Sequence, residues 1–93
     1  MNKDTCWIET FTGRRFYLLE PTPEQVFIED ITHALANQCR FTGHVKKFYS
    51  VAEHSILVSQ LVPEPFKKQA LLHDASETYL ADISRPVEYW TPI

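Results

Sequence analysis

The chain has 93 residues, a formal net charge of −3 and only two glycines. Its length allows one domain over residues 1–93. The acidic balance argues against nucleic-acid binding, and the shortage of glycine argues against a glycine-rich phosphate loop. There is neither a signal peptide nor an apolar run of membrane-spanning length. We therefore expect a cytoplasmic protein with no membrane partner.

A β-hairpin is predicted for residues 7–19. The segment Trp7–Phe11 is rich in strand-forming residues, Thr12-Gly13 supplies a turn, and Arg15–Leu19 follows as the second strand. Prolines then end the strand, and Pro23 suits the first turn of a short helix.

A helical core is predicted from about residue 24 to residue 83. Apolar residues recur at helical spacing through Ile31, Ala34 and Leu35. Residues 40–49 have mixed polarity and a Thr-Gly pair, which predicts a loop. Ser50 is the expected N-cap of the next helix, because Glu53 three residues later completes a capping box.

The last part of the core is predicted to contain two further helices. Pro63 ends the capped helix, and the next one is expected to turn Ala70, Leu71 and Leu72 towards the core. Ser76 suits the N-cap of a final short helix, and residues 84–93 are predicted to be a tail. The fold class is therefore mainly α with a small N-terminal β-hairpin.

Two cysteines, Cys6 and Cys39, are too few for a disulfide scaffold and lack zinc-finger spacing. We expect reduced thiols, with Cys39 buried, as is usual in the cytoplasm.

The dipeptide His73-Asp74 is the most informative chemical feature, and a second histidine, His54, lies in the helix upstream. Imidazole and carboxylate together bind catalytic divalent metals, and a metal-bound water becomes nucleophilic near neutral pH. A lone His-Asp pair is more often a polar helix end, so its context decides between the two interpretations.

Three segments in a fixed order supply that context: SVAEHS at 50–55, LLHDASE at 71–77 and LADISRP at 80–86. Together they resemble the HD-domain metal-dependent phosphohydrolases. The chain looks closest to the branch of bacterial deoxyribonucleoside 5′-monophosphatases and prophage hydrolases, and residues 29–44 are similar to the prophage type. This resemblance implies an HD-domain-like helical core, a small phosphate ester, in particular a nucleotide, as substrate, and a divalent ion (Mn, Co, Mg, Zn, Ni or Fe).

The resemblance also implies a role for individual residues. It makes His54, His73 and Asp74 metal ligands and Glu77 the carboxylate that handles the proton of the attacking water or leaving group. Arg40 matches a phosphate-binding arginine, Phe41 an aromatic that stacks on the base, and Asp82 an acid that contacts the sugar. A purely structural role stays open for three of these residues: Glu77 as a solvated helix carboxylate, Phe41 in core packing and Asp82 in closing a loop.

Two more histidines, His33 and His44, belong to the prophage-type pattern without matching metal ligands. His33 is expected to be a hydrogen-bonded core or pocket-edge residue, and a solvated loop is the simpler interpretation of Lys46-Lys47.

One departure from the family pattern concerns the fourth metal ligand, a later aspartate. Glu88 is the only acid after Asp82, and family members of this branch are about twice as long. We therefore expect a shortened HD domain that associates with itself to cover the apolar faces of helices 31–35 and 56–62. The alternatives are a remnant or interaction module without turnover, and a plain helical domain with a structural His-Asp pair.

Overall fold

The N-terminal hairpin is shorter than its predicted span but has the predicted topology. The computed structural model describes residues 5–81. Strand β1 (Trp7–Glu9) pairs antiparallel with β2 (Arg15–Tyr17), and Ile8 lies opposite Phe16. The turn between them places Gly13 at φ 83°, a left-handed conformation that glycine adopts without steric cost.

A buried carboxylate joins this hairpin by hydrogen bonds to the first long helix, α1 (Ile28–Asn37). Asp30, only 1% exposed, accepts hydrogen bonds from the Thr12 amide (2.8 Å) and the Thr12 hydroxyl (3.1 Å). Between hairpin and helix, Pro23 begins the short 3₁₀-helix η2 (Pro23–Gln25), as expected. The hairpin and α1 are therefore joined by a polar contact as well as by packing.

Helix α2 (Val51–Gln60) begins at the predicted N-cap. The Ser50 hydroxyl accepts a hydrogen bond from the Glu53 amide at 3.0 Å, which satisfies one of the free N–H groups of the first turn. The preceding loop is closed by an antiparallel bridge between Cys39 and Ser50. Within the predicted loop, residues 40–43 form the 3₁₀ segment η3 (Arg40–Gly43).

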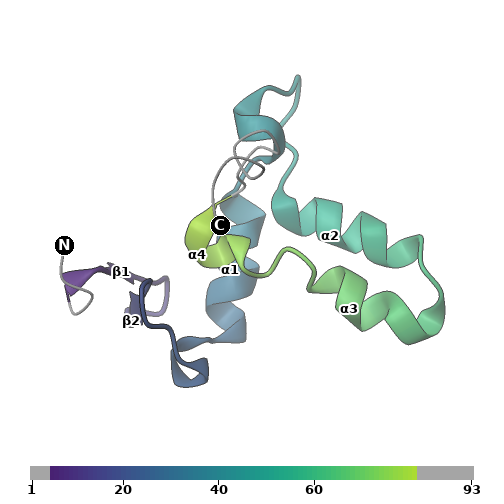
Figure 1. Cartoon of the computed structure of the whole chain (residues 1–93). Coiled ribbons are helices and arrows are strands. Elements are labelled where there is room, and N and C mark those ends of the chain that lie inside the picture. Colours follow the sequence, from purple (N-terminus) through teal and green to yellow (C-terminus); the bar gives the residue numbers. More distant parts are fainter. Residues whose placement is uncertain (1–4, 82–93) are drawn as a thin grey trace.

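The remaining helices are short. The 3₁₀-helix η4 (Glu64–Phe66) leads directly into α3 (Lys67–Leu71), and α4 (Glu77–Leu80) follows a turn that contains Ser76. Figure 1 shows α2 and α3 as a helical hairpin, with the β-hairpin at the other end of the molecule and α1 and α4 between them. Packing agrees with this view, since α2 packs most extensively on α3 and α1 contacts both α2 and α4.

The fold class is confirmed as mainly helical with a small N-terminal hairpin. Its buried apolar core is small: Phe16, Leu35 and Val51. Two expectations about burial are wrong. Leu71 and Leu72 are 43% and 41% exposed, because α3 turns little apolar surface towards the core, and Cys39 is only half-buried. Of the helices within residues 5–81, none is long and apolar enough to cross a membrane.

Candidate metal centre

Two neighbouring segments supply the three predicted metal ligands. His54 lies on the first turn of α2, where its amide donates to the Ser50 carbonyl at 3.0 Å. His73 and Asp74 lie in the turn between α3 and α4. Because α2 packs against α3, the N-terminal turn of one helix faces the C-terminal end of the other, and the three side chains meet there.

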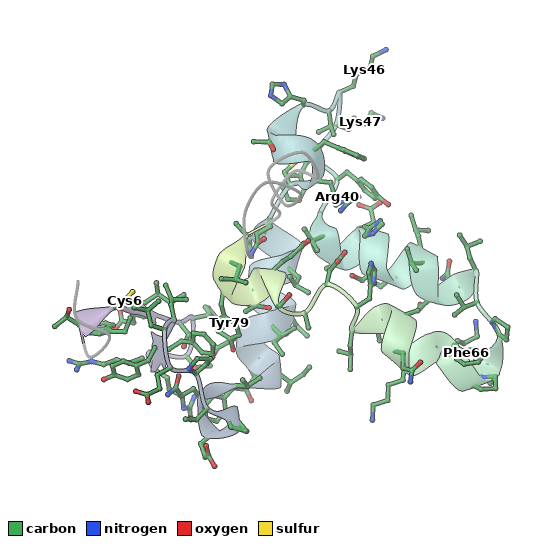
Figure 2. All side chains as sticks on the ribbon, viewed as in Figure 1. Cys6, Arg40, Lys46, Lys47, Phe66 and Tyr79 are labelled. Carbon is green, nitrogen blue, oxygen red and sulfur yellow. The ribbon has the colours of Figure 1, made fainter. Side chains whose placement is uncertain are left out.

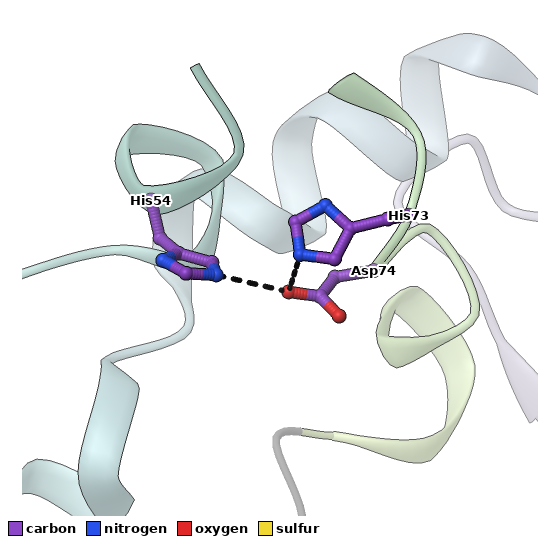
Figure 3. Close-up of side chains that lie close together, drawn as sticks. All are labelled: His54, His73 and Asp74. Carbon is purple, nitrogen blue, oxygen red and sulfur yellow. Dashed lines mark ion pairs between the residues drawn. The ribbon is translucent and has the colours of Figure 1, made fainter. Parts of the chain in front are cut away.

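The side chains converge on one carboxylate oxygen. Asp74 Oδ2 lies 2.9 Å from His73 Nε2 and 3.5 Å from His54 Nε2. Figure 3 shows both rings pointing at this oxygen. Within the described ranges, His54, His73 and Asp74 form the group whose potential ligand atoms all lie within 4.8 Å of one another. The predicted convergence is confirmed.

These separations suit a shared ion. Ligand atoms at about 2.1 Å from one metal lie roughly 3.0–3.4 Å from each other in octahedral or tetrahedral geometry. The distances from the two histidine nitrogens to Asp74 bracket that range. All three potential ligand atoms lie within 4.8 Å of one another.

The orientation of the His73 ring is fixed by a nearby backbone carbonyl. His73 Nδ1 lies within hydrogen-bond distance of the Ala70 carbonyl, and Nε2 faces Asp74 Oδ2 at 2.9 Å. In metal sites, a ligand histidine commonly donates its other ring N–H to a backbone carbonyl, and this hydrogen bond fixes the orientation of the ring.

Glu77 lies one turn beyond Asp74 and is not part of the converging group. Its amide donates to the Asp74 carbonyl at 2.9 Å, and its own carbonyl accepts from the Gln38 side chain at 2.8 Å. Its Oε2 atom is buried, so the alternative of a fully solvated helix carboxylate is wrong. The main chain of Glu77 is thus held beside Gln38, at the C-terminal end of α1.

The loop before α2 holds Arg40 and Phe41. The Arg40 amide donates to the Tyr49 carbonyl at 2.8 Å, and Tyr49 also touches the His54 ring edge-on, with ring centroids 6.3 Å apart. In Figure 2, Arg40 lies at the end of α2 that carries His54, while Lys46 and Lys47 project from the far tip of the loop. Arg40 is therefore connected through Tyr49 to His54 on α2.

Phe41 has an unusual backbone. Three consecutive residues have positive φ angles: Phe41 at 57°, Thr42 at 53° and Gly43 at 83°. Left-handed conformations cost a non-glycine residue about 1–2 kcal/mol, and such strain concentrates at functional sites. Phe41 is 57% exposed with the Arg40 guanidinium 4.9 Å from its ring centroid, so core packing does not explain it.

Three further residues can be compared with what the sequence predicted: Asp82, His33 and Asp30. Asp82 lies outside the described residues, so its predicted contact with a sugar stays a prediction. His33 is exposed and stacks on Phe11, which matches the pocket-edge alternative. The burial of Asp30 was not predicted, since a carboxylate in the first turn of a helix is usually solvated.

No protein-family model matches the chain. Similar proteins include the uncharacterized protein YfdR of Escherichia coli, which is 46% identical over 86 residues, covering 92% of this chain and 48% of YfdR. An uncharacterized protein of Rhodobacter capsulatus is 44% identical over 92 residues, covering 89% of this chain and 47% of that protein. The chain spans about half the length of the curated relatives it matches.

Proposed function

We propose that the chain is a metal-dependent phosphohydrolase scaffold of the HD type that acts on a nucleotide phosphomonoester. The observation that carries the proposal is the convergence of His54, His73 and Asp74 beside the loop that presents Arg40 and Phe41. Three protein ligands leave coordination positions for water and substrate, which is the usual arrangement of catalytic rather than structural metal sites.

The charge distribution around this loop supports an anionic substrate. Between Asp30 and Glu53 the sequence contains no acid, although the whole chain has 12 acids and a net charge of −3. The same stretch contains Arg40, Lys46 and Lys47. This loop therefore carries a net positive charge in a protein whose net charge is −3.

Each residue has a distinct role in this proposal. His54, His73 and Asp74 would hold the divalent ion, which would supply Lewis-acid polarisation of the phosphoryl group and a water molecule of lowered pKa. Arg40 binds phosphate oxygens, for which its forked guanidinium is well shaped. The exposed ring of Phe41 stacks on the base, Glu77 manages the proton of the water or leaving group, and Asp82 contacts the sugar.

A second candidate function is an HD-domain remnant or interaction module without turnover. It uses the same converging group of His54, His73 and Asp74. The two functions differ in a measurable way, because a remnant that keeps its three ligands binds metal without hydrolysing a phosphate ester.

Metal binding is tested first, by metal analysis of the purified protein and by titration of the metal-free protein with Mn²⁺, Co²⁺ and Zn²⁺. We expect one ion per chain, and we expect His73→Ala to lower the affinity at least about 100-fold. His44→Ala is the matched control, since His44 is an exposed histidine outside the converging group. Equal metal affinity in wild type and His73→Ala would refute the metal centre.

Hydrolysis is tested with deoxynucleoside 5′-monophosphates in the presence of Mn²⁺ or Co²⁺. We expect Arg40→Ala to raise KM about 10-fold or more and to leave metal affinity unchanged. Arg15→Ala is the matched control, because Arg15 lies on the distant hairpin and stacks on Trp7. Loss of metal from Arg40→Ala would assign Arg40 a structural role instead.

We also propose that the chain self-associates and works in the cytoplasm. Apolar side chains on α2 and in the following turn are exposed, with Ile56 at 49%, Leu57 at 45% and Leu61 at 84%. The apolar face of the helix at residues 31–35 was also expected to be exposed. This expectation is wrong for Leu35, which is buried. Association through α2 would cover a face that this fold leaves open. Free Cys6 and Cys39 are consistent with a reducing compartment.

A further inference from the structure

A cavity separate from the candidate metal centre opens between β1, α1 and α4. Its volume is about 250 Å³, and none of its lining residues belongs to the group of His54, His73 and Asp74. A cavity of this size accommodates one small ring compound.

Part of the cavity lining is aromatic or apolar. Phe11 and His33 both line it, and their rings stack with centroids 3.7 Å apart and planes within 9° of parallel. Ile8 from β1 and Ala34 from α1 complete the apolar lining. Such a surface favours a planar aromatic guest, because flat rings pack on flat rings with the largest contact.

The cavity lining also includes buried polar atoms. Asp30 is 1% exposed, and its two hydrogen bonds from Thr12 occupy only half of the acceptor capacity of a carboxylate. The Thr78 hydroxyl is buried and has no hydrogen-bond partner among residues 5–81. Burial, and next the Asp30 carboxylate, raise the pKa of Tyr79, so its phenol stays neutral at physiological pH. These atoms can receive hydrogen bonds from a guest.

The cavity lining contains carboxylates but no lysine or arginine from the described residues. Its ionisable lining residues are Glu9, Asp30, His33 and Tyr79. A phosphate or carboxylate guest would therefore meet the buried negative charge of Asp30. This electrostatic pattern is opposite to that of the loop at 40–48, so the cavity does not suit the substrate of the metal centre.

We propose that this cavity binds a small planar nitrogen compound, such as an aromatic amidine or amine. Its ring lies against the Phe11–His33 stack, and its N–H groups donate to Asp30 and Thr78. Charged hydrogen bonds of this kind are stronger than neutral ones and reject anions of the same shape.

The test uses benzamidine and benzoate, two compounds of nearly equal shape and opposite charge, added to the ¹⁵N-labelled wild-type protein. We expect benzamidine to shift the amide resonances of residues that line the cavity and benzoate to bind at least about 10-fold more weakly, since 1.4 kcal/mol corresponds to a factor of ten. No binding of benzamidine, equal binding of benzoate, or shifts scattered over the surface would each overturn the proposal.

Variants locate the site independently of the metal centre. Ala34→Leu fills the cavity and should abolish benzamidine binding, and Asp30→Asn should weaken it at least about 10-fold. His73→Ala should leave it unchanged, so the cavity proposal and the proposed hydrolase activity can fail separately. Unchanged binding in a folded Ala34→Leu protein would contradict the assignment, whether or not Asp30→Asn folds.

Discussion

Replacing Thr12 by valine tests the polar contact that joins the hairpin to α1. The substitution keeps the size of the side chain and removes the hydroxyl that donates to Asp30 at 3.1 Å, while the Thr12 amide still donates at 2.8 Å. Asp30 is 1% exposed, so the substitution leaves a buried carboxylate with one hydrogen bond fewer. A hydrogen bond to a charged group contributes about 1.5–3 kcal/mol to stability.

We therefore expect Thr12→Val to lower the free energy of unfolding by about 1.5–3 kcal/mol. For a domain of this size the corresponding fall in Tm is about 6–24 °C. Urea denaturation followed by circular dichroism measures the free energy, and a thermal scan measures Tm. Thr12→Ser is the control, since it keeps the hydroxyl.

A loss below about 0.5 kcal/mol for Thr12→Val would refute this reasoning, because surface substitutions commonly fall in that range. It would mean that Asp30 finds another donor. The Thr10 hydroxyl, which lies 3.3 Å from the Thr12 hydroxyl, is a candidate.

Four further outcomes are expected. Ser50→Ala should destabilise the protein by about 1 kcal/mol in urea, because it removes the hydroxyl that caps α2, whereas Ser50→Thr should retain most of the stability. Gly13→Ala should cost about 1 kcal/mol in the same assay, since φ is 83° there; a neutral effect would mean that the turn rearranges. In an alkaline titration of tyrosine absorbance, Tyr79→Phe should remove a group that ionises above its usual pKa of 10.0. Because the pKa of Tyr79 is raised in the folded state, the stabilising contribution of its neutral phenol is complete below about pH 10. That contribution is lost as the pH rises through the pKa of Tyr79 in the folded protein. Light scattering should show concentration-dependent association that Leu61→Lys weakens and Leu19→Lys on the distant hairpin does not; a monomer at every concentration would contradict self-association.

Local chemistry made much of the fold predictable. The N-cap at Ser50 and the turn at Gly13 are confirmed because each depends on a few neighbouring residues and on backbone conformation. The convergence of His54 with His73 was predicted from a family resemblance, since no spacing rule brings separate helices together. The three-ligand geometry is confirmed, but occupancy by a metal stays a prediction.

Errors arose where burial depends on partners distant in sequence. Leu71 and Leu72 continue an apolar pattern, but a pattern identifies an apolar face without showing that another element covers it. The cavity beside Asp30 could not be predicted for the same reason. It exists because the hairpin, α1 and α4 meet there, and none of the three segments alone indicates an enclosed space.

The N-cap at Ser50 has a consequence for the evolution of this protein. The bridge between Cys39 and Ser50 closes the base of the preceding loop, and the cap then fixes the helix turn that carries His54. Residues inserted or deleted at the tip of the loop, around Lys46, would leave that base in place. The size of the loop can therefore change over generations while His54, His73 and Asp74 keep their mutual geometry.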